Sequence, residues 1–394
     1  MSTAKGSSGS SSPESVALGQ VLTFFGAVAD YAAGAVANEG ERVAWLAASM
    51  AQLAGMPQDD LDALYFAARL RNAGALGNVA FAKGEQLAER ALTMQRWDIP
   101  ADGARICERI AALPTGTPDL VRWQAEAWDG TGFPDQLRWS GIPRAAQLLH
   151  IASVYAAVPD PDEALSAITS ESGRAFAPEQ VRTFILWFHT SRGEIGPRDV
   201  PYRALDTARS SPEQILDLLA ERVDAHNGTP KRAQRIAALA ADIADELGFD
   251  LAERRTVRTA AQLFGVGEIR APQLEAQQFD PLARLGIETR AHHAIAAEHL
   301  AAQCEYLAAI APVLRARAEW YDGTGGPDRL RHSAIPRASE ILAVAIAFDA
   351  LNEAYRSRIT EERALPVVRL ETAAGTQFDP QTVRALANAI KARA

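Results

Sequence analysis

The chain has 394 residues, of which 48% are hydrophobic and 23% are charged, a composition typical of a soluble protein with two or three domains. Its formal net charge of -9 argues against a nucleic-acid partner, because phosphate backbones are bound by clustered Lys and Arg side chains. The two cysteines, Cys107 and Cys304, lie far apart and outside any metal-binding spacing. We therefore expect two buried, reduced thiols in a cytoplasmic protein.

The N-terminal residues 1–15 are rich in Ser and Gly, which predicts a flexible tail without the apolar core of a signal peptide. No apolar run reaches the length that we would expect of a membrane span. These two observations favour a protein with no membrane-spanning segment.

Residues 16–190 are predicted to form a first, helical domain. The run "ERVAWLAASMAQLAGM" (41–56) has apolar residues at helical spacing and a plausible stop at Gly55. A turn-rich stretch, "EAWDGTGFP" (126–134), follows later, and Ile142-Pro143 precedes another apolar helix. A proline-containing linker is predicted at 191–210.

Residues 211–394 are predicted to form a second domain that repeats the first. The run "KRAQRIAALAADIADELGF" (231–249) stops at Gly248, and the turn-rich stretch recurs as "EWYDGTGGP" (319–327), 193 residues after its first occurrence. No run alternates like a strand. We therefore predict an all-α fold of two tandem helical bundles related by internal duplication, packed as a pseudo-twofold pair.

The quoted motifs resemble a known family. The order of Arg42-Val43, Ala67-Ala68-x-Leu-x-x-x-Gly, Glu-x-x-Asp-Gly-Thr-Gly-x-Pro and Ile-Pro, with similar segments in the second half, resembles the HD-GYP branch of the HD-domain phosphohydrolases. The resemblance implies an α-helical domain in which His and Asp side chains hold two or three metal ions. It also implies hydrolysis of a cyclic dinucleotide, cyclic di-GMP.

The metal-ligand positions that this resemblance implies carry residues of other types in both halves, with the exception of His292. The positions are Glu39, Arg71, Asn72, Ile99, Gln124, Ala125 and Ser153 in the first half, and Arg232, Phe264, Gly265, His292, Arg317, Ala318 and Ile346 in the second. The implied phosphate-binding positions fall on Ala75 and Gln147, and on Glu268 and Glu340. Since dinuclear metal catalysis needs several converging ligands, we expect neither a catalytic residue nor a cofactor.

The leading hypothesis from the sequence is therefore a catalytically inactive, cytoplasmic signalling adaptor or scaffold. Its partners would be proteins, such as second-messenger or two-component signalling proteins. The first alternative is a sensor that binds a cyclic dinucleotide, or another small ligand, in a collapsed pocket without cleaving it. The second is a residual metal-dependent phosphohydrolase that uses His292, the only position of the implied ligand set that keeps its histidine.

The two turn-rich loops supply the candidate contact residues. Asp129 and Asp322 are expected to cap their turns, and Glu126 and Glu319 to bind arginines, although an acid/base pair is the alternative. Aromatic and Arg side chains beside a rigid loop suit either a contact surface or anchoring on the domain's own core. The candidates for ligand or partner binding are Trp128, Asp129, Phe133, Arg138, Arg144, Tyr321, Asp322, Arg331 and Arg337.

Overall fold

A computed structural model describes most of the chain. The described residues are 12–36, 38–76, 98–191, 193, 202–203, 205–269, 286–355 and 365–393. They divide into two compact units, Met1–Ile215 and Leu216–Ala394. Within the described residues the regular structure is helical, with two isolated bridges, Ser172 to Phe176 and Ala374 to Phe378. The prediction of an all-α fold is confirmed.

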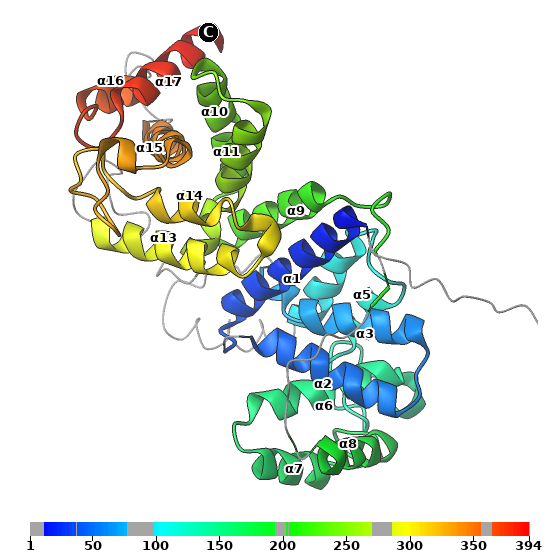
Figure 1. Cartoon of the computed structure of the whole chain (residues 1–394). Helices are drawn as coiled ribbons and strands as arrows, with labels where there is room; N and C mark the ends of the chain where they lie inside the picture. The colour runs from blue at the N-terminus through cyan, green and yellow to red at the C-terminus, as the bar shows by residue number, and fades with distance from the viewer. Residues whose placement is uncertain are drawn as a thin grey trace, which may run out of the picture. The chain divides into compact units, whose positions relative to one another are not determined.

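The first unit is a bundle of helices (Figure 1). Residues 98–108 are also helical and precede the short α5. In chain order the named elements are α1 (Pro13–Ala33), α2 (Glu39–Leu53), α3 (Gln58–Leu70), η1 (Ala73–Leu76), α5 (Thr117–Arg122), η2 (Trp139–Gly141), α6 (Arg144–Ala157), α7 (Pro161–Ser170) and α8 (Pro178–Ser191).

The second unit repeats this order of elements. Its helix α9 begins just before the division between the units. The elements are α9 (Pro212–His226), α10 (Arg232–Glu246), α11 (Leu251–Leu263), η3 (Phe264–Glu268), α13 (Ile287–Ala302), η4 (Glu305–Leu307), α14 (Ala311–Ala316), η5 (His332–Ala334), α15 (Arg337–Tyr355), α16 (Leu365–Thr372) and α17 (Pro380–Arg393).

Helix α1 has the length and apolar composition of a membrane span, which the sequence analysis did not recognise. Over half of its most apolar stretch is buried, and the helix packs against η1, α3 and α2. Its start is capped by Ser12, whose hydroxyl accepts the N–H of Ser15 at 3.2 Å, so the helix begins inside the segment predicted as a flexible tail. The rest of that predicted tail, residues 1–11, lies outside the described residues. This burial identifies α1 as a core helix of the first unit.

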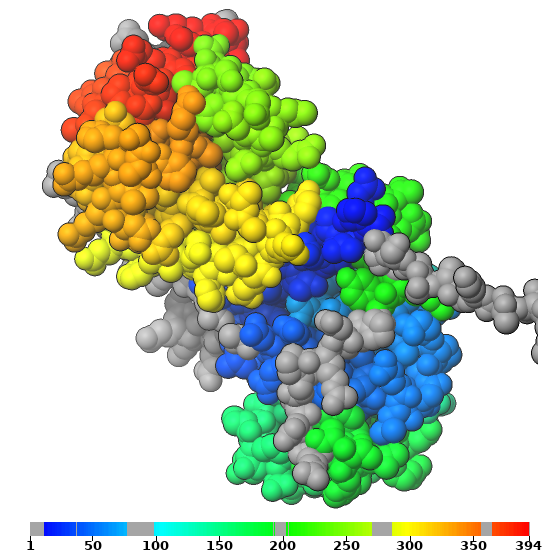
Figure 2. All heavy atoms as spheres, viewed as in Figure 1, coloured from blue at the N-terminus to red at the C-terminus, as the bar shows by residue number. Residues whose placement is uncertain are grey.

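In each unit one helix packs against two others. In the first unit α2 packs against α3 and α6, and in the second α10 packs against α11 and α15. The predicted helix stops are confirmed, because Gly55 (φ 66°) and Gly248 (φ 70°) both adopt the left-handed conformation that glycine accommodates best. Figure 2 shows α17 (red) beside α10 (light green) at the surface of the second unit.

A close helix approach recurs in both units. A Cβ atom on Gly74 would lie 2.0 Å from the carbonyl oxygen of Ile99, and one on Gly267 would lie 2.0 Å from that of His293. Only glycine fits at these crossings, since the neighbouring atoms are backbone and cannot move aside. The crossing brings the end of α3 or α11 against the helix that follows, where the candidate site residues gather.

The described part of the predicted linker packs on the first unit. The Tyr202 ring stacks on that of Tyr65 at 5.1 Å between centroids, and the N–H of Leu205 donates to the Ser15 hydroxyl at 2.8 Å. The predicted linker bounds, 191–210, stay a prediction. Both cysteines are free and buried, and burial raises the pKa of Cys107 to about 12.

Candidate functional site

The loop at 126–134 is organised around a buried carboxylate. Glu126 is 2% exposed, and its two oxygens accept the backbone N–H groups of Asp135 at 2.7 Å and Leu137 at 2.9 Å. Glu319 does the same in the second unit, accepting from Asp328 at 2.5 Å and Leu330 at 3.1 Å. The prediction that these glutamates bind arginines is wrong, because both oxygens of each carboxylate accept loop N–H groups and neither carboxylate forms an ion pair with an arginine of the described residues. Burial nevertheless raises the pKa of Glu126 and of Glu319.

The two turn aspartates behave as expected from their Asp-Gly-Thr-Gly motif. Asp129 accepts the N–H of Thr131 at 2.9 Å and its hydroxyl at 2.6 Å, and Asp322 binds Thr324 at the same two distances. These hydrogen bonds lower the pKa of Asp129. Each aspartate therefore closes its own turn, and the alternative of an acid/base pair with the neighbouring glutamate has no geometric support.

Each loop is also tied to the turn before the last helix of its unit. The N–H groups of Trp128 and Asp129 donate to the carbonyls of Ala175 and Arg174, at 3.0 and 2.9 Å. Tyr321 and Asp322 donate in the same way to Gln377 and Thr376. The prolines of both loops follow cis peptide bonds. The backbone hydrogen bonds hold each loop against the turn that precedes α8 or α17.

The predicted contact residues are brought together only in part. Arg138 and Arg331 lie over the turn glycines Gly130 and Gly323, beside the loop aspartates. The ring of Tyr321 meets that of His332 edge-on at 4.6 Å. The half-buried Phe133 donates its N–H to the carbonyl of Ala125 at 3.2 Å.

The other two predicted contact arginines lie apart from the turns. Arg144 pairs with Glu179 at 3.0 Å, and Arg337 covers the ring of Phe249 at 4.8 Å. Arg144 and Arg337 are the first residues of α6 and α15, and each contacts a side chain that lies outside the loop.

In the first unit, the positions implied as metal ligands hold a buried ion-pair cluster. Arg71 is 3% exposed and contacts Glu39 at 2.6 Å and Asp30 at 3.2 Å. Asp30 also accepts from the side chain of Asn72 at 2.8 Å, and the side-chain amide of Gln124 donates to the Arg71 carbonyl at 2.8 Å. The guanidinium carries the positive charge at the centre of this cluster, and both carboxylates are engaged.

The second unit has an ion-pair cluster at the matching place, with an arginine where the first unit has Glu39. Arg232, 193 residues after Glu39, binds Glu268 at 2.7 Å. Phe264 replaces Arg71, and the guanidiniums of Arg232 and Arg317 lie 4.8 and 5.8 Å from its ring centre. Buried Arg317 donates weakly to the Phe264 carbonyl at 3.4 Å, and its Nε has no hydrogen-bond partner in the described part of the chain. Burial lowers the pKa of Arg317 to about 10.

Each cluster also contains a buried aspartate that the sequence did not single out. Asp30 accepts the N–H of Gly40 at 3.0 Å, and Asp224 accepts that of Ala233, the matching position, at 2.8 Å. Burial raises the pKa of Asp224 to about 6. Asp30 lies one position further from Gly40 than Asp224 lies from Ala233, so the constant spacing of 193 did not align the two aspartates.

The remaining implied ligand positions offer no metal-binding group. Ser153 bonds within its own helix, Ile99 and Ile346 are aliphatic, and Ala318 accepts a loop N–H through its carbonyl. Gly265 offers only its carbonyl, which accepts from Asn227 at 3.1 Å.

His292 does not join the second cluster. It is exposed on α13, and its neighbour His293 is the histidine whose charge acts on Glu268. Among the described residues there is no group of three or more His, Cys, Asp or Glu side chains that could hold a metal ion. The donor sets of the two clusters therefore do not fit the metal ions that the HD-GYP resemblance implies.

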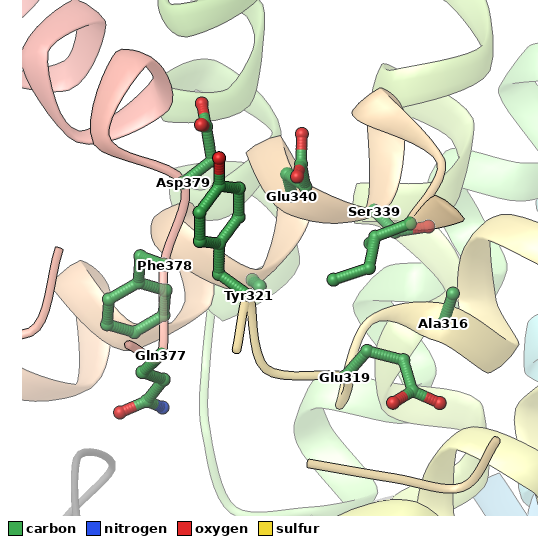
Figure 3. Close-up of a pocket in the computed structure, with 10 residues that line it drawn as sticks. Ala316, Glu319, Tyr321, Ser339, Glu340, Gln377, Phe378 and Asp379 are labelled. Atoms are coloured by element: carbon green, nitrogen blue, oxygen red, sulfur yellow. The ribbon is translucent and has the colours of Figure 1, made fainter. Parts of the chain in front are cut away.

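A small cavity lies behind the second loop (Figure 3). Its volume of about 10 Å³ is close to the minimum for one water molecule. Tyr321, Glu340 and Asp379 gather on one side, while the carboxylate of Glu319 points away from them towards its loop. Burial, followed by the nearby charge of Asp379, raises the pKa of Glu340 to about 7. The cavity is too small for a nucleotide.

Comparisons with known proteins give the family and the fold. A family model described as HD domain matches residues 27–180 and 213–382. The chain is 26% identical over 307 residues to 3'3'-cGAMP-specific phosphodiesterase 3 of Vibrio cholerae, covering 74% of this chain and 65% of that protein. It is 32% identical over 178 residues to the cyclic di-GMP phosphodiesterase response regulator RpfG of Xanthomonas campestris, covering 44% and 47%. The chain thus spans less than two thirds of the length of these relatives.

A solved structure agrees with the fold. The crystal structure of a cyclic GMP-AMP phosphodiesterase of V. cholerae (V-cGAP3) has a TM-score of 0.66 and 19% identity, covering 95% of this chain and 97% of that one. These findings overturn the expectation of a catalytically inactive adaptor, since the relatives are named as phosphodiesterases. The expectation that the chain is no enzyme is corrected for the same reason. The predicted protein partners stay a prediction.

Proposed function

Because this chain belongs to the HD-domain family, we propose that it is a phosphodiesterase that acts on a 3',3'-cyclic dinucleotide in second-messenger signalling. The observation that carries the proposal is the 307-residue alignment to a 3'3'-cGAMP-specific phosphodiesterase, which extends across both units. We also propose that the two units are tandem HD domains that arose by duplication, and that the protein works in the cytoplasm. The two ranges matched by the family model and the repeated order of helices support the duplication.

We further propose that the implied metal-ligand set is replaced in both halves. The support is the nature of the two clusters: a guanidinium lies against the carboxylates in each, and a divalent cation beside it would be repelled. Arginine side chains also neutralise phosphate oxygens, through paired N–H donors. Arg71, Arg232 and Arg317 are the cluster residues with the chemistry to bind a phosphodiester.

The proposal is tested by incubating the purified chain with 3'3'-cGAMP and, separately, with cyclic di-GMP, and by separating the products chromatographically. We expect the linear dinucleotide to accumulate from at least one substrate, with time and with protein concentration. Heat-denatured protein serves as the control. If neither substrate is opened over several hours at micromolar protein, the proposed function is wrong.

A further inference from the structure

A cavity in the first unit lies apart from the ion-pair cluster. Its volume is about 390 Å³, within the range of small-molecule sites. Its lining residues come from the first turns of α3 and α6, from α5, and from the turn that follows α2. Arg71 follows the far end of α3, about 16 Å along the helix from Asp60 at 1.5 Å per residue, so the two sites are distinct.

Two carboxylates give the cavity its negative character. Asp60 and Asp119 line it, and neither side chain makes a hydrogen bond or ion pair with another described residue. The cavity's one cationic lining residue, Arg144, is paired with Glu179 at 3.0 Å. The cavity therefore has two acceptors to offer and no unpaired positive charge of its own.

An aromatic wall completes the site. Trp123 lines the cavity, and its Nε1–H donates to Asp135 at 2.8 Å, which fixes the orientation of the indole ring. Met56 and Leu120 add apolar surface. An indole face beside carboxylates is a common way to bind organic cations, through cation–π attraction and charge-assisted hydrogen bonds.

The second unit shows how the same place is closed. Phe249 stands where the first unit has Met56; it is 4% exposed and lies under the guanidinium of Arg337 at 4.8 Å. Pro312 and Ala316 stand where the first unit has Asp119 and Trp123. The carboxylate of Asp119 and the indole of Trp123 therefore have no counterpart in the second unit, whereas Asp60 matches Glu253, and the second unit carries a buried phenylalanine at the position of Met56.

We propose that this cavity binds a small organic cation, an ammonium group carried on a flat apolar body. The ammonium group lies between Asp60 and Asp119, and the apolar body lies against Trp123 and Met56. The inference is independent of the phosphodiesterase proposal, because it uses none of the residues of the ion-pair clusters.

The test uses 2-phenylethylammonium as the probe, with 2-phenylethanol and phenylacetate as neutral and anionic controls. Saturation-transfer NMR and calorimetric titration on the full chain would measure binding. We expect the amine to bind and the two controls to bind at least tenfold more weakly. Equal binding of all three compounds, or no binding of the amine at millimolar concentration, would overturn the proposal.

Two variants localise the site. Met56→Phe, which copies the second unit, should abolish amine binding while leaving the melting temperature unchanged. Asp119→Asn keeps the shape and should weaken binding by about fivefold, the effect expected of one partly exposed charge pair. If Met56→Phe folds as the wild type does and still binds the amine, or if Asp119→Asn leaves the affinity unchanged, the cavity is not the binding site.

Discussion

Glu126 and Glu319 set the shape of the most recognisable feature of this sequence. Each buried carboxylate accepts two loop N–H groups and so holds the residues that follow its Asp-Gly-Thr-Gly-x-Pro turn. The turn aspartates and glycines could be interpreted from sequence, because their preferences are local. The role of the glutamates could not, because their partners are backbone groups nine and eleven residues away.

Replacing Glu126 by Gln should destabilise the first unit by about 1–3 kcal/mol, because one loop N–H then faces an amide NH₂ in place of an acceptor. Chemical denaturation followed by circular dichroism measures the change. Glu171→Gln is the control, since that carboxylate pairs with the exposed Arg174 and should cost well under 1 kcal/mol. If the two substitutions lower the free energy of unfolding equally, the Glu126 carboxylate does not stabilise the loop as proposed.

Asp224 gives the second unit a defined pH dependence. Burial raises the pKa of this carboxyl from its ordinary value of 3.8 to about 6 in the folded chain. The folded state therefore holds the proton more tightly than the unfolded state, and this group's contribution to stability falls as the pH rises from about 4 to about 6. Asp224→Asn keeps an acceptor for the Ala233 N–H and carries no charge.

The difference in free energy of unfolding, Asp224→Asn minus wild type, should therefore increase by up to about 3 kcal/mol between pH 4 and pH 7. Urea unfolding at the two pH values measures the gain. The exposed Glu246→Gln substitution is the matched control and should show no such difference. If the difference in free energy of unfolding between Asp224→Asn and wild type stays constant over this range, the raised pKa is not that of Asp224.

The helix crossings are the feature of the fold that both units repeat most closely. Gly74 and Gly267 stand at the same place, and each allows a backbone contact that a methyl group would block at 2.0 Å. The sequence aligned the two glycines but did not show why they are needed, since the contacting carbonyls belong to the following helix. Gly74→Ala should destabilise the first unit by several kcal/mol, an effect of backbone displacement. A calorimetric scan measures it, with Gly141→Ala, which has open space around it, as the control.

The ion-pair clusters join α1, α2 and α3 in the first unit, and α9, α10 and η3 in the second. From the residue types we expected other side chains at the implied ligand positions, but not that these side chains bind one another. Arg71→Met removes the cationic partner of buried Asp30 and half-buried Glu39 and should cost about 3–5 kcal/mol. Adding Glu39→Leu to that variant should recover part of the loss, which thermodynamic cycles from denaturant unfolding would quantify. A double variant less stable than Arg71→Met would contradict the ion-pair account.

At the scale of the whole molecule, periodicity predicted an all-α chain correctly, because both halves carry long amphipathic helices. The membrane-span length of α1 was missed, and only its packing against α2 and α3 shows it to be a core helix. The residue types at the implied ligand positions led to the hypothesis of an inactive adaptor, and the similarity to named phosphodiesterases corrects it. Activity is a property of a complete site, and residue types at separate positions did not reveal that site.

Removal of divalent metal tests the clusters across both units. Because each cluster already carries a guanidinium against its carboxylates, treatment with EDTA should shift the melting temperature by less than about 1 °C, where loss of a structural metal would remove several kcal/mol. Differential scanning calorimetry before and after dialysis measures the shift. The His292→Ala variant should retain the same metal content as the wild type. A bound metal that is lost with EDTA together with a large fall in melting temperature would contradict the cluster assignment.

The central claim is that this chain opens the phosphodiester ring of a cyclic dinucleotide. The most direct measurement is a single-turnover reaction with the chain in excess over 3'3'-cGAMP, in which mass spectrometry follows the conversion of the cyclic to the linear dinucleotide. The account predicts a linear product that gains the mass of one water and forms only with folded protein. Recovery of all the substrate in its cyclic form, and the same result with cyclic di-GMP, would contradict it.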